Sequence, residues 1–170
     1  RLFRFQRPCP ATGYRVPSLK RLGAMINIFA KQLEPFKVKL SKLLFYADFL
    51  HFKNYGESIS GNSYQAIGLG PVPHRYGTLF ENGAENGYYS LEQVLFEEHE
   101  GEKFKPSTME ELEGELNKQE IETLRIVKEQ LGRKSTKELV KLSHDELGWQ
   151  EYEKEQGIID YSYAFKLQHF

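Results

Sequence analysis

Several features that define common protein classes are missing from this sequence. Its one cysteine, Cys9, cannot form an internal disulfide framework, which suits a reducing cytoplasm. No apolar run approaches the roughly 18 residues of a membrane span, and the N-terminal residues contain no apolar segment of the secretory kind. We therefore predict a cytoplasmic protein that does not contact a membrane.

The motifs of familiar catalytic sites are absent as well. The chain has no GxxxxGKS/T, no GxSxG and no CxxC, and Gly68-x-Gly70 lacks the third glycine of a dinucleotide fingerprint. A lone cysteine cannot build a zinc site, and the histidines lie in different segments. We therefore expect no metal and no cofactor, and a binding role in place of an enzymatic one.

What is present fits one folded domain. The chain has 170 residues, of which 39% are hydrophobic and 14% aromatic, so its core should be rich in Phe and Tyr. Residues 1–17 contain three prolines and are predicted to form an N-terminal arm or linker. The domain itself is expected at residues 18–170. Because the chain begins with Arg1 and not Met, we also expect a fragment or a processed form of a longer protein.

Charge is distributed unevenly along the chain. Residues 1–80 hold 12 Lys/Arg and 3 Asp/Glu, which gives +9, whereas residues 81–170 hold 11 and 21, which gives −10. One interpretation is that the two halves attract each other within the domain. The other is that one half docks a charged partner, although no nucleic-acid-binding motif is present.

The apolar pattern predicts two long helices in the first third of the chain. Ser18 can cap a helix that runs to about Leu33, and Pro35 separates it from the next. The second helix spans residues 38–55, and Gly56 suits its C-terminal end. Because this helix is apolar on nearly every side, it is expected to be the buried centre of the fold.

Two lines of polar side chains run along this central helix at about 100° per residue. The first, expected to be a solvent-exposed edge, comprises Lys39, Lys42, Tyr46 and Lys53. The second shares one face and comprises Ser41, Asp48, His51 and Tyr55. We interpret this second line as a structural fastening between the helix and the turn at Gly70–Pro73.

The rest of the chain predicts turns, one hairpin and short helices. Residues 57–72 are typical of turns, and Pro73 is expected in the first turn of a short helix that Gly83 closes. A β-hairpin is predicted over residues 88–106, with its turn near Glu100-Gly101. Later helices should start at four pairs with capping-box spacing: Ser107–Glu110, Asn117–Glu120, Ser135–Glu138 and Ser143–Glu146. The predicted fold class is mainly α (α+β), a compact helical domain around a buried central helix with a small β-hairpin.

Three motifs occur in order between Lys42 and Tyr76. They are an Asp-x-x-His helix in KLLFYADFLHFKNYG, the glycine that stops it, and a GPVP turn at Gly70–Pro73. Together they resemble the Panacea domain, the SocA-like antitoxin domain. The LSHDELGWQ stretch at Leu142–Gln150 is similar to the way such domains end, so the resemblance covers most of residues 18–167.

The resemblance implies a mostly helical domain that neutralises a partner toxin by binding it. The expected partner is a cognate protein toxin. Members of the family often carry an N-terminal DNA-binding or zinc-finger module, which this sequence does not contain. Whether the protein forms a homo-oligomer is left open by the resemblance. The toxin-binding surface is expected at the end of the central helix, the GPVP turn and the following helix: Tyr55, Tyr64, Pro71, Pro73, His74, Tyr76 and Phe80.

Other interpretations stay open at this point. The GPVP turn can be a rigid turn that only redirects the chain, and Trp149 can be a core anchor or an interface residue. Asp48 and His51, one helical turn apart, could be an acid–base pair or half a metal site in a hydrolase. A hydrogen-bonded pair inside a packed helix is the other alternative. A further functional alternative is an adaptor or regulatory domain that delivers a bound protein to a protease.

Overall fold

The computed structural model describes residues 1–96 and 99–170. Its elements follow one another as α1 (Leu19–Leu33), α2 (Lys37–Tyr55), β1 (Tyr64–Ile67), β2 (Gly70–Pro73), α3 (Tyr76–Glu85), β3 (Tyr89–Phe96), β4 (His99–Pro106), η1 (Glu110–Glu115), α4 (Lys118–Leu131), α5 (Thr136–Ser143), α6 (Leu147–Tyr152) and η2 (Tyr161–Lys166). The mainly helical α+β class predicted from the sequence is confirmed.

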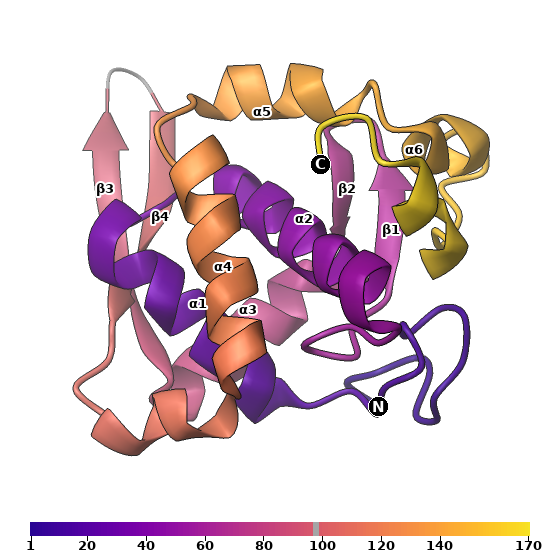
Figure 1. The fold of residues 1–170 in the computed structure, drawn as a ribbon. Helices are drawn as coiled ribbons and strands as arrows, with labels where there is room; N and C mark the ends of the chain where they lie inside the picture. Colours follow the sequence, from indigo (N-terminus) through magenta and orange to yellow (C-terminus); the bar gives the residue numbers. More distant parts are fainter. Residues whose placement is uncertain (97–98) are drawn as a thin grey trace.

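Helix α2 runs through the middle of the molecule, with other elements on every side of it (Figure 1). Every residue from Leu40 to Phe52 is buried. The elements that contact α2 are α1, α4, α5, η2, β2 and β4. A helix that is apolar on nearly every side requires such enclosure, so the predicted central helix is confirmed. No helix in the described part of the chain is long and apolar enough to cross a membrane.

The predicted caps at Ser18 and Gly56 and two of the four predicted capping boxes are correct. Ser18 accepts a hydrogen bond from the backbone N–H of Arg21 at 3.2 Å, and Gly56 ends α2 at a φ of 79°. Reciprocal capping boxes begin α4 and α5, at Asn117 and Ser135.

The boxes predicted at Ser107 and Ser143 do not form. The Ser107 hydroxyl accepts from the backbone N–H of Met109 and donates to the Gly87 carbonyl, away from any α-helix start. Ser143 is the last residue of α5, and its hydroxyl donates to the carbonyl of Val140 at 2.8 Å. Both serines satisfy nearby backbone groups, as short hydroxyl side chains do at turns and helix ends.

The predicted β-hairpin is confirmed as β3 and β4, but its turn lies elsewhere. Glu100 and Gly101 belong to β4, where they pair with Leu95 and Val94 of β3. Residues 97–98, which follow β3 in the sequence, lie outside the described residues. The bulk of the hairpin packs on α1.

A second hairpin, which the sequence pattern did not predict, is formed by β1 and β2. Pro73 pairs with Tyr64 in this ladder and does not begin a helix. Helix α3 starts at Tyr76, after Arg75 in the left-handed conformation, and Gly83 lies inside it. A two-stranded ladder has only edge strands, which is why it tolerates Pro71 and Pro73.

The two halves of opposite charge attract each other within the fold. Glu120 pairs with both Arg15 and Arg21, while Lys20 pairs with Glu115. The first of the two charge interpretations therefore accounts for these residues. It also ties the predicted N-terminal arm, through Arg15, to α4.

Gly70 sits where no side chain fits, which gives a test of how the β1–β2 hairpin docks. Its φ is +98°, and a Cβ there would meet the Ser143 hydroxyl at 2.3 Å. We expect Gly70→Ala to lower the free energy of unfolding by about 2–4 kcal/mol, from backbone strain and overpacking. Urea unfolding measures this.

Gly68 provides the matched control, because a Cβ there meets nothing within 4 Å. Gly68→Ala is expected to change stability by no more than about 0.5 kcal/mol. Equal effects of the two substitutions would contradict the close packing of β2 against Ser143.

Candidate functional site

The polar side chains of α2 bind the segments that surround it. The Lys39 ammonium donates to the carbonyls of Gly132 and Lys134, and the Lys53 ammonium donates to the carbonyl of Phe170 at 2.7 Å. The predicted solvent-exposed lysine edge is therefore wrong. Lys42 and Tyr46, its two other members, are fully buried.

Lys42 is a buried amine that fastens the GPVP segment to α2. Its ammonium donates to the carbonyl of Pro71 at 2.8 Å. Burial lowers the pKa of Lys42 to about 7, because the low-dielectric interior disfavours the charged form. The link predicted between the central helix and the GPVP turn therefore exists, but Lys42 makes it and the Asp48 line does not.

Asp48 fastens α2 to the loop that precedes β1. One carboxylate oxygen accepts the backbone N–H groups of Ile59 and Ser60 at 2.8 and 2.9 Å. The other accepts the hydroxyls of Ser60 and Tyr64 at 2.5 and 2.6 Å. Burial raises the pKa of Asp48, while these four hydrogen bonds oppose the rise. With both oxygens occupied, this carboxylate has no lone pair directed at a substrate.

His51 bonds to a different element from Asp48. Its Nδ1 lies 2.9 Å from the hydroxyl of Thr123 on α4, and its ring lies 4.6 Å from that of Tyr55. Burial lowers the pKa of His51 to about 4. The two residues of the Asp-x-x-His motif thus hold separate segments. No group of three or more His, Cys, Asp or Glu side chains suited to a metal ion occurs among the described residues.

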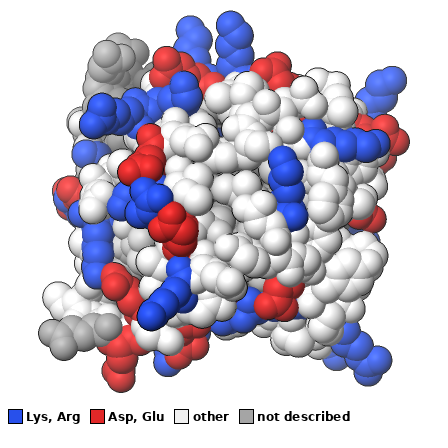
Figure 2. All heavy atoms as spheres, in the orientation of Figure 1, with Lys and Arg blue, Asp and Glu red and all other residues white. Residues whose placement is uncertain are grey.

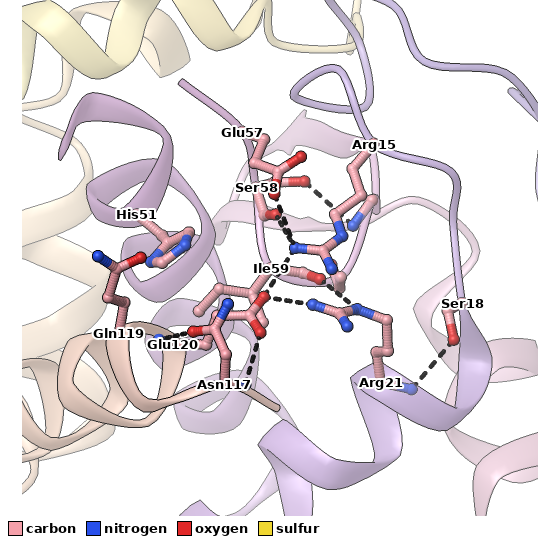
Figure 3. Close-up of polar contacts among 12 residues, drawn as sticks. Arg15, Ser18, Arg21, His51, Glu57, Ser58, Ile59, Asn117, Gln119 and Glu120 are labelled. Carbon is pink, nitrogen blue, oxygen red and sulfur yellow. Dashed lines mark hydrogen bonds and ion pairs between the residues drawn. The ribbon is translucent and has the colours of Figure 1, made fainter. Parts of the chain in front are cut away.

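A buried carboxylate, Glu120, gathers the N-terminal arm, α1 and α4 at one point. Arg15 and Arg21 point toward it from two segments (Figure 3). The Arg15 pair measures 2.7 Å, and the Glu120 side chain is only 1% exposed. Its other oxygen accepts the backbone N–H of Asn117 at 2.9 Å in the capping box. The capping box is visible in the local sequence, whereas the arginines are about a hundred residues away and no local pattern indicates them.

The seven residues predicted to bind a toxin lie in two kinds of place. Four of them are buried within the chain's own core and can only shape a surface: Tyr64, Pro71, Pro73 and Phe80. The three with accessible side chains are Tyr55, His74 and Tyr76.

These three accessible residues do not form one surface. Tyr55 is the last residue of α2, whereas the Tyr76 ring lies under the ammonium of Lys37 at the first. Eighteen helical steps separate Lys37 from Tyr55, a distance of about 27 Å. The Tyr55 end of α2 and the Tyr76 end are therefore two separate candidate surfaces.

At the Tyr55 end, aromatic side chains gather from distant parts of the sequence. Tyr14 is 52% exposed, Tyr55 47% and Phe165 62%. The rings of Tyr14 and Phe165 lie 6.2 and 5.7 Å from that of Phe52 on α2. We call Tyr14, Tyr55 and Phe165 the aromatic patch. Figure 2 shows few charged side chains in this part of the face, between the end of α2 and the C-terminal segment.

Trp149 holds the tip of the β1–β2 hairpin. Its indole N–H donates to the carbonyl of Ile67 at 2.7 Å, and its ring stacks on His144 at 4.1 Å. The His144 ring nitrogen in turn lies 3.0 Å from the carbonyl of Gly68. Trp149 thus anchors the hairpin from a half-buried position.

Comparison with known protein families identifies the family of the chain. The family model described as "Antitoxin SocA-like, Panacea domain" matches residues 40–150. The chain belongs to this family. The matched residues of this Panacea domain include α2 from Leu40 onward, both hairpins and Trp149. Neither a curated protein nor a solved structure matches the chain.

The depressed pKa of Lys42 predicts a pH dependence of stability. Between about pH 7 and the ordinary lysine value of 10.5, the unfolded chain binds more protons at Lys42 than the folded chain. The free energy of unfolding therefore rises with pH in this window. We expect the free energy of unfolding of wild type, relative to that of Lys42→Met, to increase between about pH 7 and pH 9. The increase should be at most about 1.4 kcal/mol per pH unit.

Urea unfolding of both proteins at the two pH values measures this, because other titrating groups cancel in the difference. Lys137→Met, at an exposed position, is the control. A difference between wild type and Lys42→Met that stays constant with pH would contradict a buried, proton-releasing Lys42.

The Glu120 contacts predict a large loss of stability on removing one charge. Glu120→Gln keeps the shape of the side chain but leaves Arg21 without its carboxylate, and leaves Arg15 with the more exposed Glu57 alone. We expect the free energy of unfolding to fall by about 2–4 kcal/mol, as measured by urea unfolding. The control is Glu122→Gln, whose carboxylate pairs with Arg125 in solvent, where the expected loss is no more than about 0.5 kcal/mol. Similar losses in both would refute the role of burial.

Proposed function

We propose that this protein is an antitoxin that binds and neutralises a cognate protein toxin. The observation that carries the proposal is membership of the SocA-like Panacea family, established over residues 40–150. The arrangement of the Asp-x-x-His motif supports a binding role over catalysis. The Asp48 carboxylate accepts four hydrogen bonds, and His51 forms a hydrogen bond with Thr123 of α4.

The aromatic patch is the surface that we propose for toxin binding. Exposed aromatic rings contribute much of the energy of protein interfaces, because they bury a large area with few rotatable bonds. Two of the three rings rest on the buried Phe52 and the third on His51. Their positions are therefore set before a partner arrives, which lowers the entropic cost of binding.

The backbone at Tyr14 supports this choice. Tyr14 adopts a left-handed conformation, with a φ of 57°, which is unfavourable for a bulky side chain. Its N–H donates to the carbonyl of Cys9 at 3.0 Å, which helps to hold the turn. Strained residues that a fold retains are often functional, and the strain here presents an aromatic ring to solvent.

The proposed mechanism is occlusion. The toxin's working surface would pack against the aromatic patch and be covered while the complex persists. The chemistry then belongs to the toxin, and this protein contributes a rigid complementary surface. Tyr76, at the other end of α2, belongs to a second candidate surface.

Co-expression with the product of a neighbouring growth-arresting gene tests the function. We expect the wild-type chain to restore growth and to co-purify with the toxin. Tyr55→Ala with Phe165→Ala should abolish rescue, since truncating interface aromatics typically costs about 2 kcal/mol or more each. Both positions are solvent-exposed, so the variant should still fold, which urea unfolding checks.

Leu95→Ala is the matched control, because Leu95 is 72% exposed but lies on β3, outside the patch. It should rescue growth as well as wild type does. If wild type neither rescues nor co-purifies with the neighbour, the antitoxin function is wrong. If the double variant rescues growth as well as wild type does, the toxin binds a different surface, and Tyr76→Ala is the next variant to test.

A further inference from the structure

The N-terminal residues fold against the domain and surround an open pocket of about 570 Å³. Leu2 and Phe3 pack on the core. The pocket is lined by three arginines and their neighbours: Arg1, Arg4, Phe5, Gln6, Arg7 and Cys9. Among the described residues no carboxylate lines it, and the charged side chains that do are arginines.

The backbone of this segment is held at both ends, so the arginines are not on a loose tail. The Arg75 guanidinium donates to the carbonyl of Arg1 at 2.5 Å. At the other end, the buried Thr12 hydroxyl accepts the N–H of Cys9 at 3.0 Å and donates to the carbonyl of Cys9. A segment fixed in this way brings its side chains together before a ligand binds.

Within the described residues, no carboxylate pairs with the arginines of this region. No ion pair within the described part of the chain involves Arg1, Arg4, Arg7 or Arg75. Elsewhere, Arg15, Arg21 and Arg125 all have carboxylate partners. An unpaired group of arginines on a chain with a net charge of −1 is a local feature that an anionic ligand would complete.

His74, the residue before Arg75, gives a second observation. Its Nδ1 is buried and has no hydrogen-bond partner among the described residues. Burial lowers the pKa of His74, and the charges of Arg75 and Arg4 lower it further. The charges of these arginines therefore act on the His74 imidazole, and a bound anion would raise the pKa of His74.

We propose that this pocket binds a phosphate-bearing anion, as a nucleotide phosphate or as the backbone of a nucleic acid. Guanidinium groups match phosphate oxygens with paired N–H donors. The Arg4 guanidinium lies over the Phe5 ring at 5.2 Å, and both side chains line the pocket. The residues that line the pocket include none of the three rings of the aromatic patch, so the proposal does not rest on toxin binding.

Calorimetric titration of the full chain with pyrophosphate and with a short single-stranded oligonucleotide tests the proposal. We expect both probes to bind wild type. The double variant Arg4→Ala with Arg7→Ala should bind pyrophosphate at least about tenfold more weakly, a loss of about 1.4 kcal/mol. For the oligonucleotide, the slope of log K against log salt should fall by about 0.7 for each arginine removed.

Arg133→Ala is the matched control, since Arg133 is exposed and far from the pocket in sequence. It should leave both affinities unchanged. Comparing the two probes identifies the source: tighter binding of pyrophosphate indicates a nucleotide-sized ligand, and tighter binding of the oligonucleotide indicates a nucleic-acid backbone.

The pKa of His74, followed by NMR, locates the bound anion. It should rise when pyrophosphate is added to wild type and stay constant in the double variant. The proposal is overturned if neither probe binds, if Arg133→Ala weakens binding as much as the double variant, or if polyglutamate binds and pyrophosphate does not. The last result would identify an acidic protein surface as the ligand.

Discussion

The burial of α2 on all sides is the constraint on which the rest of the structure depends. A helix enclosed in this way must give each polar side chain a partner inside the protein, because an unpaired buried polar group costs several kcal/mol. Lys42, Asp48 and His51 meet this requirement by bonding to three different segments. The hydrogen bonds that satisfy these buried groups thereby attach a hairpin, a loop and a helix to α2 at specific positions.

The sequence predicted well what local chemistry decides. Helices α1 and α2 follow from Ser18, Pro35 and Gly56, each of which acts on the few residues around it. The β1–β2 hairpin was not predicted because Pro71 and Pro73 are typical of turns. The GPVP segment forms a strand in a hairpin that docks on α2, and this contact is not visible in the local sequence. Lys42 was assigned to solvent for a similar reason, since its partner, the Pro71 carbonyl, is 29 residues away.

The candidate site was less predictable than the fold, for a physical reason. A binding surface is made of side chains that the core leaves exposed, and this depends on every packing contact beneath them. Tyr55 could be named as a candidate from the sequence because it lies at the end of α2, just after the last buried residue of that helix. Tyr14 and Phe165 could not, because they come from opposite ends of the chain and both pack on Phe52.

The N-terminal segment illustrates how internal attachment and exposed function are linked. From sequence it was an arm or linker, yet Thr12 is fully buried and Arg15 pairs with the buried Glu120. These contacts fix the segment between the aromatic patch, to which it contributes Tyr14, and the arginine pocket. Weakening the Glu120 pairs would therefore disturb a surface that Glu120 does not touch. Mutational effects on binding in this protein thus need a parallel measurement of stability before they are assigned to an interface.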